Sequence, residues 1–329
     1  MHAMLVTAFG SADVIQPGEI PTPQPRPMDL LIEVHAAALN PIEWKIRKGA
    51  FREGRRLPFV PTYDLAGRVI AIGSDAFQYG FKPGDDVYAM GNILRDGAAA
   101  ESVCVDARTV AIKPRSIDFA HAAALPLATL TAWEALYDRA AIADGETILI
   151  HGGGGGVGHI AIQLARLRGA RVLTTASRPE TIELCRRLGA QQVIDYTKQD
   201  VTAVVKELTE GQGCQVIFDT VGGPTLDQSG ASLAVAGRLV TIVGTPIITG
   251  SKDFFIKGTT VHYQFVSGVH IHKLDPSRHG QILRQAAELV DAGKLQPHIE
   301  TIFPLAELAA AHRLAETAHV TGKIVIQVR

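Results

Sequence analysis

A run of five glycines at residues 152–156 constrains the fold of this chain more than any other stretch of its sequence. Residues 147–150, just before the run, are apolar and rich in β-branched side chains, which predicts a short buried strand. From residue 159 to residue 167 apolar side chains recur at helical spacing, which predicts a helix. Between a strand and a helix, the Gly-x-Gly-x-x-Gly motif that begins at Gly153 indicates dinucleotide binding.

The requirement for glycine in such a turn has a physical basis. A tight strand-to-helix turn needs backbone angles that only glycine adopts at low cost. The pyrophosphate must approach the backbone closely, and the following helix offers it unpaired N–H groups. A flexible linker is the alternative interpretation, but a linker needs neither a strand before it nor a helix after it. The residues expected to hold the pyrophosphate are Gly153, Gly154, Gly155, Gly156, Val157 and Gly158.

Beyond about residue 118 the sequence alternates between short apolar runs and helical patterns. This alternation predicts an α/β domain with a doubly wound parallel sheet. The later strands are expected at residues 171–176, 192–195, 215–220, 238–243 and 260–265, and the helices near 157–168, 179–188, 200–209 and 224–234.

Residues 1–117 show many short apolar runs separated by glycine and proline turns, which predicts a β-barrel or sandwich. Residues 17–27 contain six prolines or glycines and are expected to form an irregular connection. The tail, with helical patterns followed by an apolar run at 323–328, is expected to rejoin this first domain. The predicted domains are therefore 1–120 with 267–329, and 121–266.

Composition and charge exclude several classes of protein. A formal net charge of −1 gives no electrostatic case for nucleic acid or an anionic membrane. The start of the chain lacks the pattern of a signal peptide, and no apolar run reaches the roughly 20 residues of a membrane span. Three widely separated cysteines are typical of a reducing compartment rather than a disulfide framework. We therefore expect a cytoplasmic protein.

The end of the second expected strand indicates which dinucleotide binds. An NAD site usually has Asp or Glu about 20 residues beyond the glycines, where it holds the ribose 2′-hydroxyl. Here Ser177 and Arg178 occupy that place, and Glu180 falls in the first turn of the next expected helix. A guanidinium suits a 2′-phosphate, so the sequence favours NADP(H).

Motifs across nearly the whole chain resemble the zinc-independent quinone oxidoreductase and enone reductase branch, which includes the zeta-crystallin-like proteins, of the medium-chain dehydrogenase/reductase superfamily. The resemblance implies a GroES-like β-barrel, built from both chain ends, around a Rossmann domain, usually as a homodimer. The motifs are Asn-Pro-Ile-Glu-Trp-Lys at 40–45, Val-Pro-Thr-Tyr-Asp-Leu-Ala-Gly at 60–67, Pro-Gly-Asp-Asp-Val at 83–87, Ala-Leu-Pro-Leu-Ala-Thr-Leu-Thr-Ala at 124–132, the glycine run, Phe-Asp-Thr-Val-Gly-Gly at 218–223 and Gly-Lys-Ile-Val at 322–325.

The same resemblance implies roles for individual residues. Ser177, Arg178 and Tyr196 would meet the adenosine 2′-phosphate, and Asn40 would lie in the active-site cleft. The residues implied along the nicotinamide end of the cofactor are Thr131, Val221, Val243, Gly244 and Thr245.

The chain departs from the zinc-dependent relatives of this superfamily. Those relatives carry a catalytic Cys and a Gly-His-Glu motif, whereas residues 61–64 here are Pro-Thr-Tyr-Asp. Zinc needs three or four convergent ligands, and the sequence offers no such set; His270-x-His272 is its best histidine pair. We therefore expect NADPH and no metal.

These observations predict hydride transfer from NADPH to a quinone or to an α,β-unsaturated carbonyl. The charge that develops on the substrate oxygen needs a hydrogen-bond donor, for which Lys45, Asn40 and Tyr63 are the candidates. Lys45 resembles the arrangement in enone and oxoene reductases, and this resemblance favours an α,β-unsaturated carbonyl over a quinone. Non-catalytic alternatives stay open for all three residues. These are a turn residue for Asn40, a solvated surface charge for Lys45 and a packed aromatic side chain for Tyr63. Asp64 and Asp219 are expected to be structural carboxylates.

Two other classes of function remain possible from the sequence. One is a zinc-dependent alcohol dehydrogenase, which the missing ligands disfavour. The other is a non-catalytic protein that binds NADPH, as a crystallin or a sensor.

Overall fold

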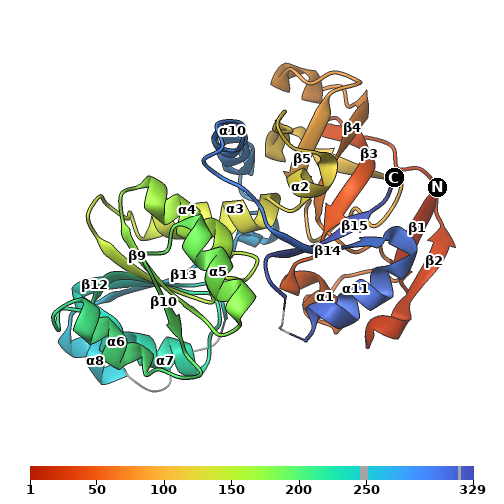
Figure 1. The fold of residues 1–329 in the computed structure, drawn as a ribbon. Coiled ribbons are helices and arrows are strands. Elements are labelled where there is room, and N and C mark those ends of the chain that lie inside the picture. The colour runs from red at the N-terminus through yellow and green to blue at the C-terminus, as the bar shows by residue number, and fades with distance from the viewer. Residues whose placement is uncertain (245–250, 318–319) are drawn as a thin grey trace. The chain divides into compact units, whose positions relative to one another are not determined.

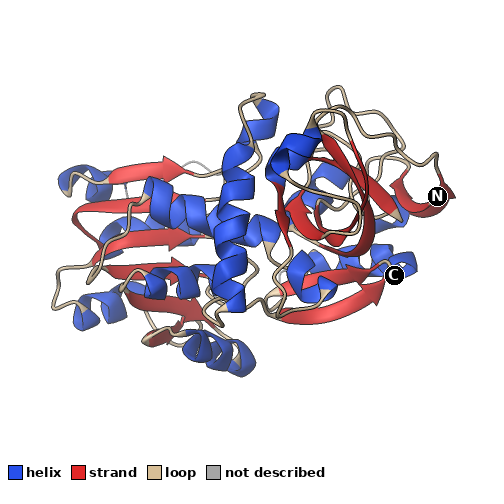
Figure 2. Cartoon of the chain, turned by 90° about the horizontal axis from the view of Figure 1, so that it is seen from above, coloured by secondary structure: helices blue, strands red, loops and turns tan. Residues whose placement is uncertain are grey.

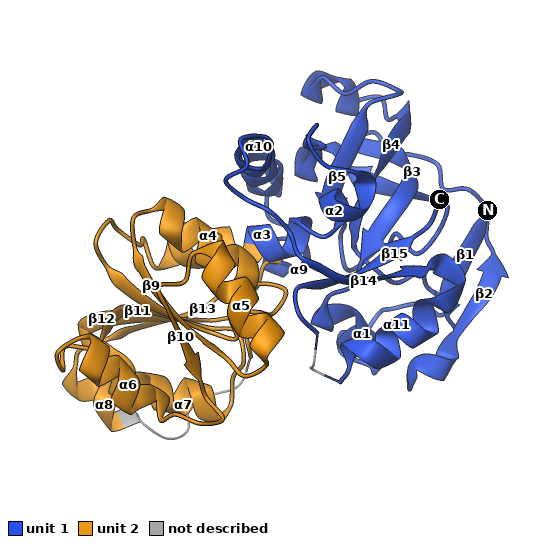
Figure 3. Ribbon diagram, in the orientation of Figure 1, with its two compact units in different colours: residues 1–130, 267–329 blue, residues 131–266 orange. Residues whose placement is uncertain are grey.

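The computed structural model describes residues 1–244, 251–317 and 320–329. The chain divides into two compact units, which are coloured separately in Figure 3. Unit 1 contains residues 1–130 and 267–329, and unit 2 contains residues 131–266.

Unit 1 consists mainly of short strands with helices between and after them (Figure 1). Its strands are β1 (His2–Val6), β2 (Ile15–Glu19), β3 (Asp29–Ala38), β4 (Asp64–Ile72), β5 (Asp86–Met90), β6 (Ser102–Asp106), β7 (Val110–Ile112), β14 (Ile299–Pro304) and β15 (Lys323–Gln327). Its helices are α1 (Pro41–Arg47), α2 (Phe119–Ala123), the start of α3 (Pro126–Trp133), α9 (Gly268–Ile271), α10 (Ser277–Asp291) and α11 (Leu308–Ala315).

Strand β3 organises the main sheet of unit 1. One edge of β3 pairs antiparallel with β4, and the other edge is shared by two strands. Residues 29–33 pair with β6, and residues 36–38 pair with β15, the last strand of the chain. Only Glu33 and His35 of β3 are not buried. The pairing of β3 with β15 joins the tail to the first part of the chain, as the sequence predicts.

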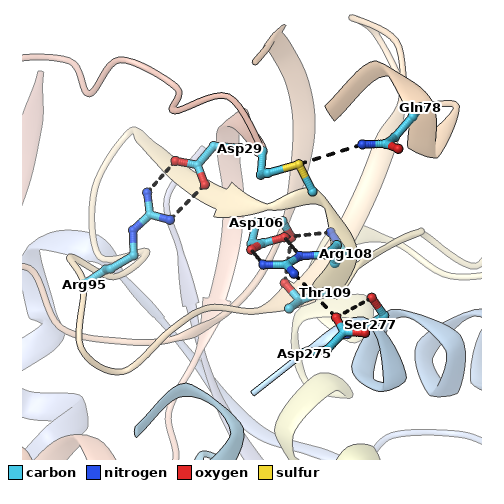
Figure 4. Close-up of polar contacts among 9 residues, drawn as sticks. Asp29, Gln78, Arg95, Asp106, Arg108, Thr109, Asp275 and Ser277 are labelled. Carbon is cyan, nitrogen blue, oxygen red and sulfur yellow. Dashed lines mark hydrogen bonds and ion pairs between the residues drawn. The ribbon is translucent and has the colours of Figure 1, made fainter. Parts of the chain in front are cut away.

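Polar contacts also connect the tail of unit 1 to its N-terminal part (Figure 4). The guanidinium of Arg108 lies 2.7 Å from Asp106 and 3.5 Å from Asp275. Asp275 in turn accepts hydrogen bonds from the backbone N–H and the hydroxyl of Ser277, where α10 begins. Arg95 and Asp29 form a second, two-pronged ion pair in the same region.

Unit 2 has a sheet of parallel strands with helices on both faces (Figures 1 and 2). Its strands are β8 (Thr147–His151), β9 (Arg171–Ala176), β10 (Gln192–Asp195), β11 (Cys214–Asp219), β12 (Leu233–Thr241) and β13 (Thr260–Tyr263). Helices α4 (Gly158–Leu167) and α5 (Pro179–Leu188) cover one face, and α6 (Val201–Leu208), α7 (Pro224–Ser232) and α8 (Ser251–Ile256) cover the other.

The strand order of this sheet is β10-β9-β8-β11-β12-β13, and each described pair is parallel. This is the order of the doubly wound Rossmann fold, in which the chain runs outward over the first three strands and then crosses back to the other side of the first strand. The carboxyl ends of all these strands lie at one edge of the sheet. In such sheets ligands bind at that edge, beside the first strand, which is β8.

Each unit has its own hydrophobic core. In unit 1 the core lies between the strands and includes Ile32, Leu65 and Ile324. In unit 2 it includes Leu149 and Ile217 of the central strands. None of the helices in the described residues is long and apolar enough to cross a membrane.

The structure corrects the sequence-based expectation for part of residues 17–27. Residues 15–19 form β2, which pairs antiparallel with β1. Proline lacks a backbone N–H and is tolerated in edge strands. Pro17 is compatible with β2 because the described sheet contains only β1 and β2, which makes β2 an edge strand. The structure also moves the predicted domain boundary from residue 121 to residue 131, since residues 121–130 lie in unit 1. In this stretch of the chain α2 packs against β3 and β4.

We expect Tyr88→Phe to lower the free energy of unfolding by about 1 to 2 kcal/mol, because a buried carbonyl loses its hydroxyl partner. The hydroxyl of Tyr88 in β5 donates a hydrogen bond of 2.5 Å to the carbonyl of Leu283 in α10, and Tyr88 is fully buried. Urea unfolding measures the change. Tyr79→Phe is the matched control, since Tyr79 is exposed. Equal effects of the two substitutions would contradict the importance of this contact.

Candidate active site

The glycine run forms a tight turn between β8 and α4, as the sequence predicts. Gly152 has a φ of 73°, which lies in the left-handed region. The N–H groups of Gly152 and Gly153 donate to the side-chain and backbone oxygens of Thr175 in the neighbouring strand β9. The turn is therefore anchored to the sheet at the carboxyl edge.

Two glycines in this turn are required by close packing. A Cβ at Gly153 would lie 2.0 Å from the hydroxyl of Thr174, and a Cβ at Gly158 would lie 2.1 Å from the carbonyl of Gly152. These approaches bring the start of α4 directly against the turn. The residues present thus fit the pyrophosphate of a dinucleotide, which binds at such a helix N-terminus.

The residues expected around the 2′-phosphate follow two neighbouring strands. Ser177 comes directly after β9, and Tyr196 comes directly after β10, whose Asp195 pairs with Ala176. The hydroxyl of Ser177 lies 3.1 Å from that of Tyr196. Arg178 precedes α5, and its Nε lies 3.3 Å from Glu180, which is in the first turn of α5 as expected. The hydroxyl groups of Ser177 and Tyr196 and the guanidinium of Arg178 therefore come from residues at the same carboxyl edge of the sheet.

Other predicted cofactor residues lie in the same unit. Asp219, at the end of β11, is fully buried and accepts hydrogen bonds from the N–H groups of Val221 and Gly222. It is thus a structural carboxylate that supports this loop, as expected, and Val221 is half exposed on it. The N–H of Val243 donates to the hydroxyl of Thr241, and Gly244 follows it. Thr245 lies outside the described residues.

Thr131 lies on α3 and is buried. Its hydroxyl has no hydrogen-bond partner among the residues that the structure describes. Buried hydroxyl groups are usually paired, so this hydroxyl is available to a ligand group, while the place of Thr131 near the nicotinamide stays a prediction.

The predicted catalytic residues lie in unit 1, around the start of α1. Asn40 is the N-cap of α1 and Pro41 is its first residue, which is a favourable start for a helix. The carboxylate of Glu43 reaches back and accepts a hydrogen bond from the backbone N–H of Asn40. It also accepts one of 3.3 Å from the N–H of Tyr63. Glu43 therefore joins the helix start to the segment that carries Tyr63.

Asn40 also belongs to a buried ionic cluster. Its amide nitrogen donates to Asp64 at 2.9 Å, and its carbonyl oxygen accepts a hydrogen bond from the ammonium of Lys323. Lys323 lies 3.2 Å from the same oxygen of Asp64. Asn40, Glu43, Asp64 and Lys323 are each no more than 5% exposed. We call these four residues the buried ionic cluster.

Asp64 has a second contact that extends the cluster to α3. Its other carboxylate oxygen accepts a hydrogen bond of 2.9 Å from the backbone N–H of Leu127. Asp64 is therefore a structural carboxylate that satisfies a backbone donor, as the sequence predicts. Sequence reasoning missed Glu43 and Lys323, although Lys323 lies in the Gly-Lys-Ile-Val motif. An apolar strand that begins with a lysine is the signal that could have found it.

The cluster contains two carboxyl groups and one ammonium, so it cannot be neutral unless it holds one proton. Burial is the main cause that raises the pKa of Glu43 to about 8, with Asp64 raising it further and the charge of Lys323 opposing both. Burial also raises the pKa of Asp64, against the opposing effect of Lys323 and Asn40. Since an unpaired buried charge is costly, burial favours a protonated carboxyl group within this cluster, and Glu43 is a candidate to carry that proton.

The three predicted hydrogen-bond donors have different surroundings. Both polar atoms of the Asn40 side chain are engaged inside the cluster. Lys45 is exposed on α1, with its ammonium 5.6 Å from the centre of the Trp44 ring. Tyr63 is buried, its hydroxyl lies 3.3 Å from Arg55, and burial raises its pKa to about 12. The hydroxyl of Tyr63 therefore keeps its proton at neutral pH.

Zinc does not fit the side chains present in the described part of the chain. Zinc needs three or four convergent ligands, and the described residues form no group of three or more His, Cys, Asp and Glu side chains suited to a metal. In the cluster the oxygens of Asp64 are occupied by an ammonium, an amide and a backbone N–H. The described cysteines are buried separately in β6, α5 and β11.

Comparison with known proteins identifies the family. Residues 26–115 match the alcohol dehydrogenase GroES-like domain, and residues 188–326 match a family described as zinc-binding dehydrogenase. The chain belongs to the medium-chain dehydrogenase/reductase superfamily, with a Rossmann domain and a GroES-like domain.

Three individual proteins illustrate this relationship. The chain is 33% identical to the chloroplastic NADPH-dependent alkenal/one oxidoreductase of Arabidopsis thaliana, over 99% of this chain and 79% of that protein. It is 30% identical to the quinone oxidoreductase of Homo sapiens, over 99% of this chain and 97% of that protein. The crystal structure of an alcohol dehydrogenase superfamily protein from Novosphingobium aromaticivorans is 36% identical, covers both chains completely and superposes with a TM-score of 0.93.

We expect Glu43→Gln to remove a pH-dependent loss of stability. Folding raises the pKa of Glu43 from its ordinary value of 4.5 to about 8. The protonated side chain therefore contributes its full stabilisation below pH 4.5, and this contribution is lost as the pH rises through about 8. Urea unfolding between about pH 5 and about pH 9 should show that the unfolding free energy of the wild type falls relative to that of Glu43→Gln. The fall should be at most about 1.4 kcal/mol per pH unit.

Glu53→Gln is the control for this experiment, because Glu53 is exposed. Its unfolding free energy should follow that of the wild type at every pH. Parallel curves for the wild type and Glu43→Gln would show that Glu43 does not carry the proton of the cluster.

Proposed function

We propose that this chain is an NADPH-dependent reductase that transfers hydride to α,β-unsaturated carbonyls or quinones. The observation that carries the proposal is the glycine turn with Ser177, Arg178 and Tyr196 at the same edge of the unit 2 sheet. The relatives support it, since two of them are an NADPH-dependent alkenal/one oxidoreductase and a quinone oxidoreductase. Bound NADPH would supply the hydride, and the protein would bind and orient both reactants.

The protein's own contribution to the chemistry is a donor for the oxygen that becomes negative. A placed donor of this type lowers the barrier by roughly 3 kcal/mol. The contacts favour Tyr63 and Lys45 for this role, because the amide of Asn40 is committed to Asp64 and Lys323. Tyr63 holds a proton at neutral pH and Lys45 lies exposed on α1. Asn40 would then act by holding the start of α1.

We further infer that the reaction proceeds without zinc, because Lys323 already forms an ion pair with Asp64, the carboxyl group of the Pro-Thr-Tyr-Asp segment. We also infer a cytoplasmic homodimer that binds neither nucleic acid nor membrane. The near-zero net charge and the free cysteines support this inference, and light scattering would measure the oligomeric state.

The proposed activity is tested by NADPH oxidation without oxygen, with a simple enone and a simple quinone measured side by side. We expect turnover with at least one acceptor, and little with NADH. Tight NADPH binding with no oxidation by either acceptor would contradict the proposal and would favour a non-catalytic binding protein.

We expect Arg178→Gln to raise the KM for NADPH about 10- to 100-fold, because a charged hydrogen bond to the 2′-phosphate contributes about 1.5 to 3 kcal/mol. The KM for NADH should change little, since NADH lacks this phosphate. Arg187→Gln on the exposed part of α5 is the control. Equal changes in both KM values for Arg178→Gln would show that Arg178 does not recognise the phosphate.

A further inference from the structure

Next to the buried ionic cluster, the backbone of Thr62 has an unusual conformation. Thr62 has a φ of 72° and is fully buried. A β-branched residue in the left-handed region is a genuine outlier. Such strain is energetically costly and persists only where the surrounding structure holds it in place, often at active sites.

The contacts around Thr62 show what holds it. On one side, the carbonyl of Thr62 accepts a hydrogen bond of 2.5 Å from the N–H of Ala98. On the other side, the next N–H, that of Tyr63, donates to Glu43. One residue further, Asp64 is held by Lys323 and by the amide of Asn40. The strained residue thus lies directly before two consecutive residues that the cluster holds.

Lys323 is the centre of this arrangement. Its ammonium bonds to Asn40, at the start of α1, and to Asp64, at the start of β4. It is also the charged group that opposes the upward pKa shifts of both carboxyl groups. Loss of the ammonium would leave the carbonyl of Asn40 without its described donor and the carboxyl groups without a counter-charge.

From this geometry we propose that Lys323 is a positioning residue for the reduction: it fixes the Thr62–Asp64 segment and the start of α1, and so places Tyr63 and Lys45. Lys323 touches neither of these two side chains in the described contacts, and acts through Asn40, Asp64 and Glu43. The proposal rests on the proposed function, because it assigns the two donors to that reaction. It gives the last strand of the chain a part in catalysis.

The test uses the full chain with Lys323→Met, which keeps an unbranched side chain one heavy atom shorter and removes its charge. A misplacement of about 1 Å can lower a rate roughly 100-fold. We expect kcat with the preferred acceptor to fall about 10- to 100-fold, while the KM for the acceptor and the Kd for NADPH stay within about twofold. A loss in kcat without a loss in binding is typical of an interaction needed in the transition state.

A second variant separates positioning from stability. Lys323→Met with Asp64→Asn removes both members of the ion pair, so the unfolding free energy should recover relative to Lys323→Met alone. The kcat should stay low, because Asn40 still lacks its ammonium partner. Lys82→Met is the control, since Lys82 is an exposed lysine of unit 1.

Two results would overturn the proposal. One is a double variant that is as active as the wild type, which would show that Lys323 acts on stability alone. The other is a Lys323→Met protein whose loss of activity comes entirely from weaker NADPH binding. Failure of the proposed function is distinguishable from both, because the wild type would then oxidise NADPH with neither acceptor.

Discussion

The structure of unit 1 depends on the ion pair between Asp64 and Lys323. These residues come from β4 and β15, which are far apart in the sequence and lie on either side of β3. A buried pair of this kind is not in itself a strong source of stability, but removing one partner is costly because the other charge is left uncompensated. The pair therefore ties the correct closure of the discontinuous domain to the correct arrangement of Asn40, Glu43 and Tyr63.

The proposed cofactor-binding residues of unit 2 and the proposed catalytic residues of unit 1 follow different physical rules. In unit 2 the turn proposed to hold the pyrophosphate is a property of the backbone, since N–H groups, a helix N-terminus and close glycine packing form it. In unit 1 the proposed chemistry depends on side chains that are held by buried charges. This difference explains why a motif identifies the cofactor, whereas the substrate is not encoded in any comparable pattern.

Much of the fold could be predicted from the sequence because its signals are local. The strands 171–176 and 192–195 and the helix 179–188 lie where apolar periodicity placed them. The strand at 15–19 was missed because its proline and glycine are typical of loops, and only pairing with β1 makes it a strand.

The candidate site likewise has some features that follow from local sequence signals and others that depend on long-range contacts. The pairing of Ser177 with Tyr196 follows from parallel strand order, which the sequence predicts. The partnership of Lys323 with Asp64 joins residues separated by 259 positions, and no periodicity reports such a contact. The protonation of Glu43 depends on how many charges share one buried space, which only the folded structure determines.

The measurement that tests the account most directly is the fate of deuterium from 4,4-dideuterated NADPH in an oxygen-free reaction with a small enone. The account predicts a saturated ketone with deuterium on the carbon β to the carbonyl, in equal amount to the NADPH oxidised. A reduced ketone without deuterium on that carbon would contradict it, and so would an enone and a quinone that are both recovered unchanged while NADPH binds.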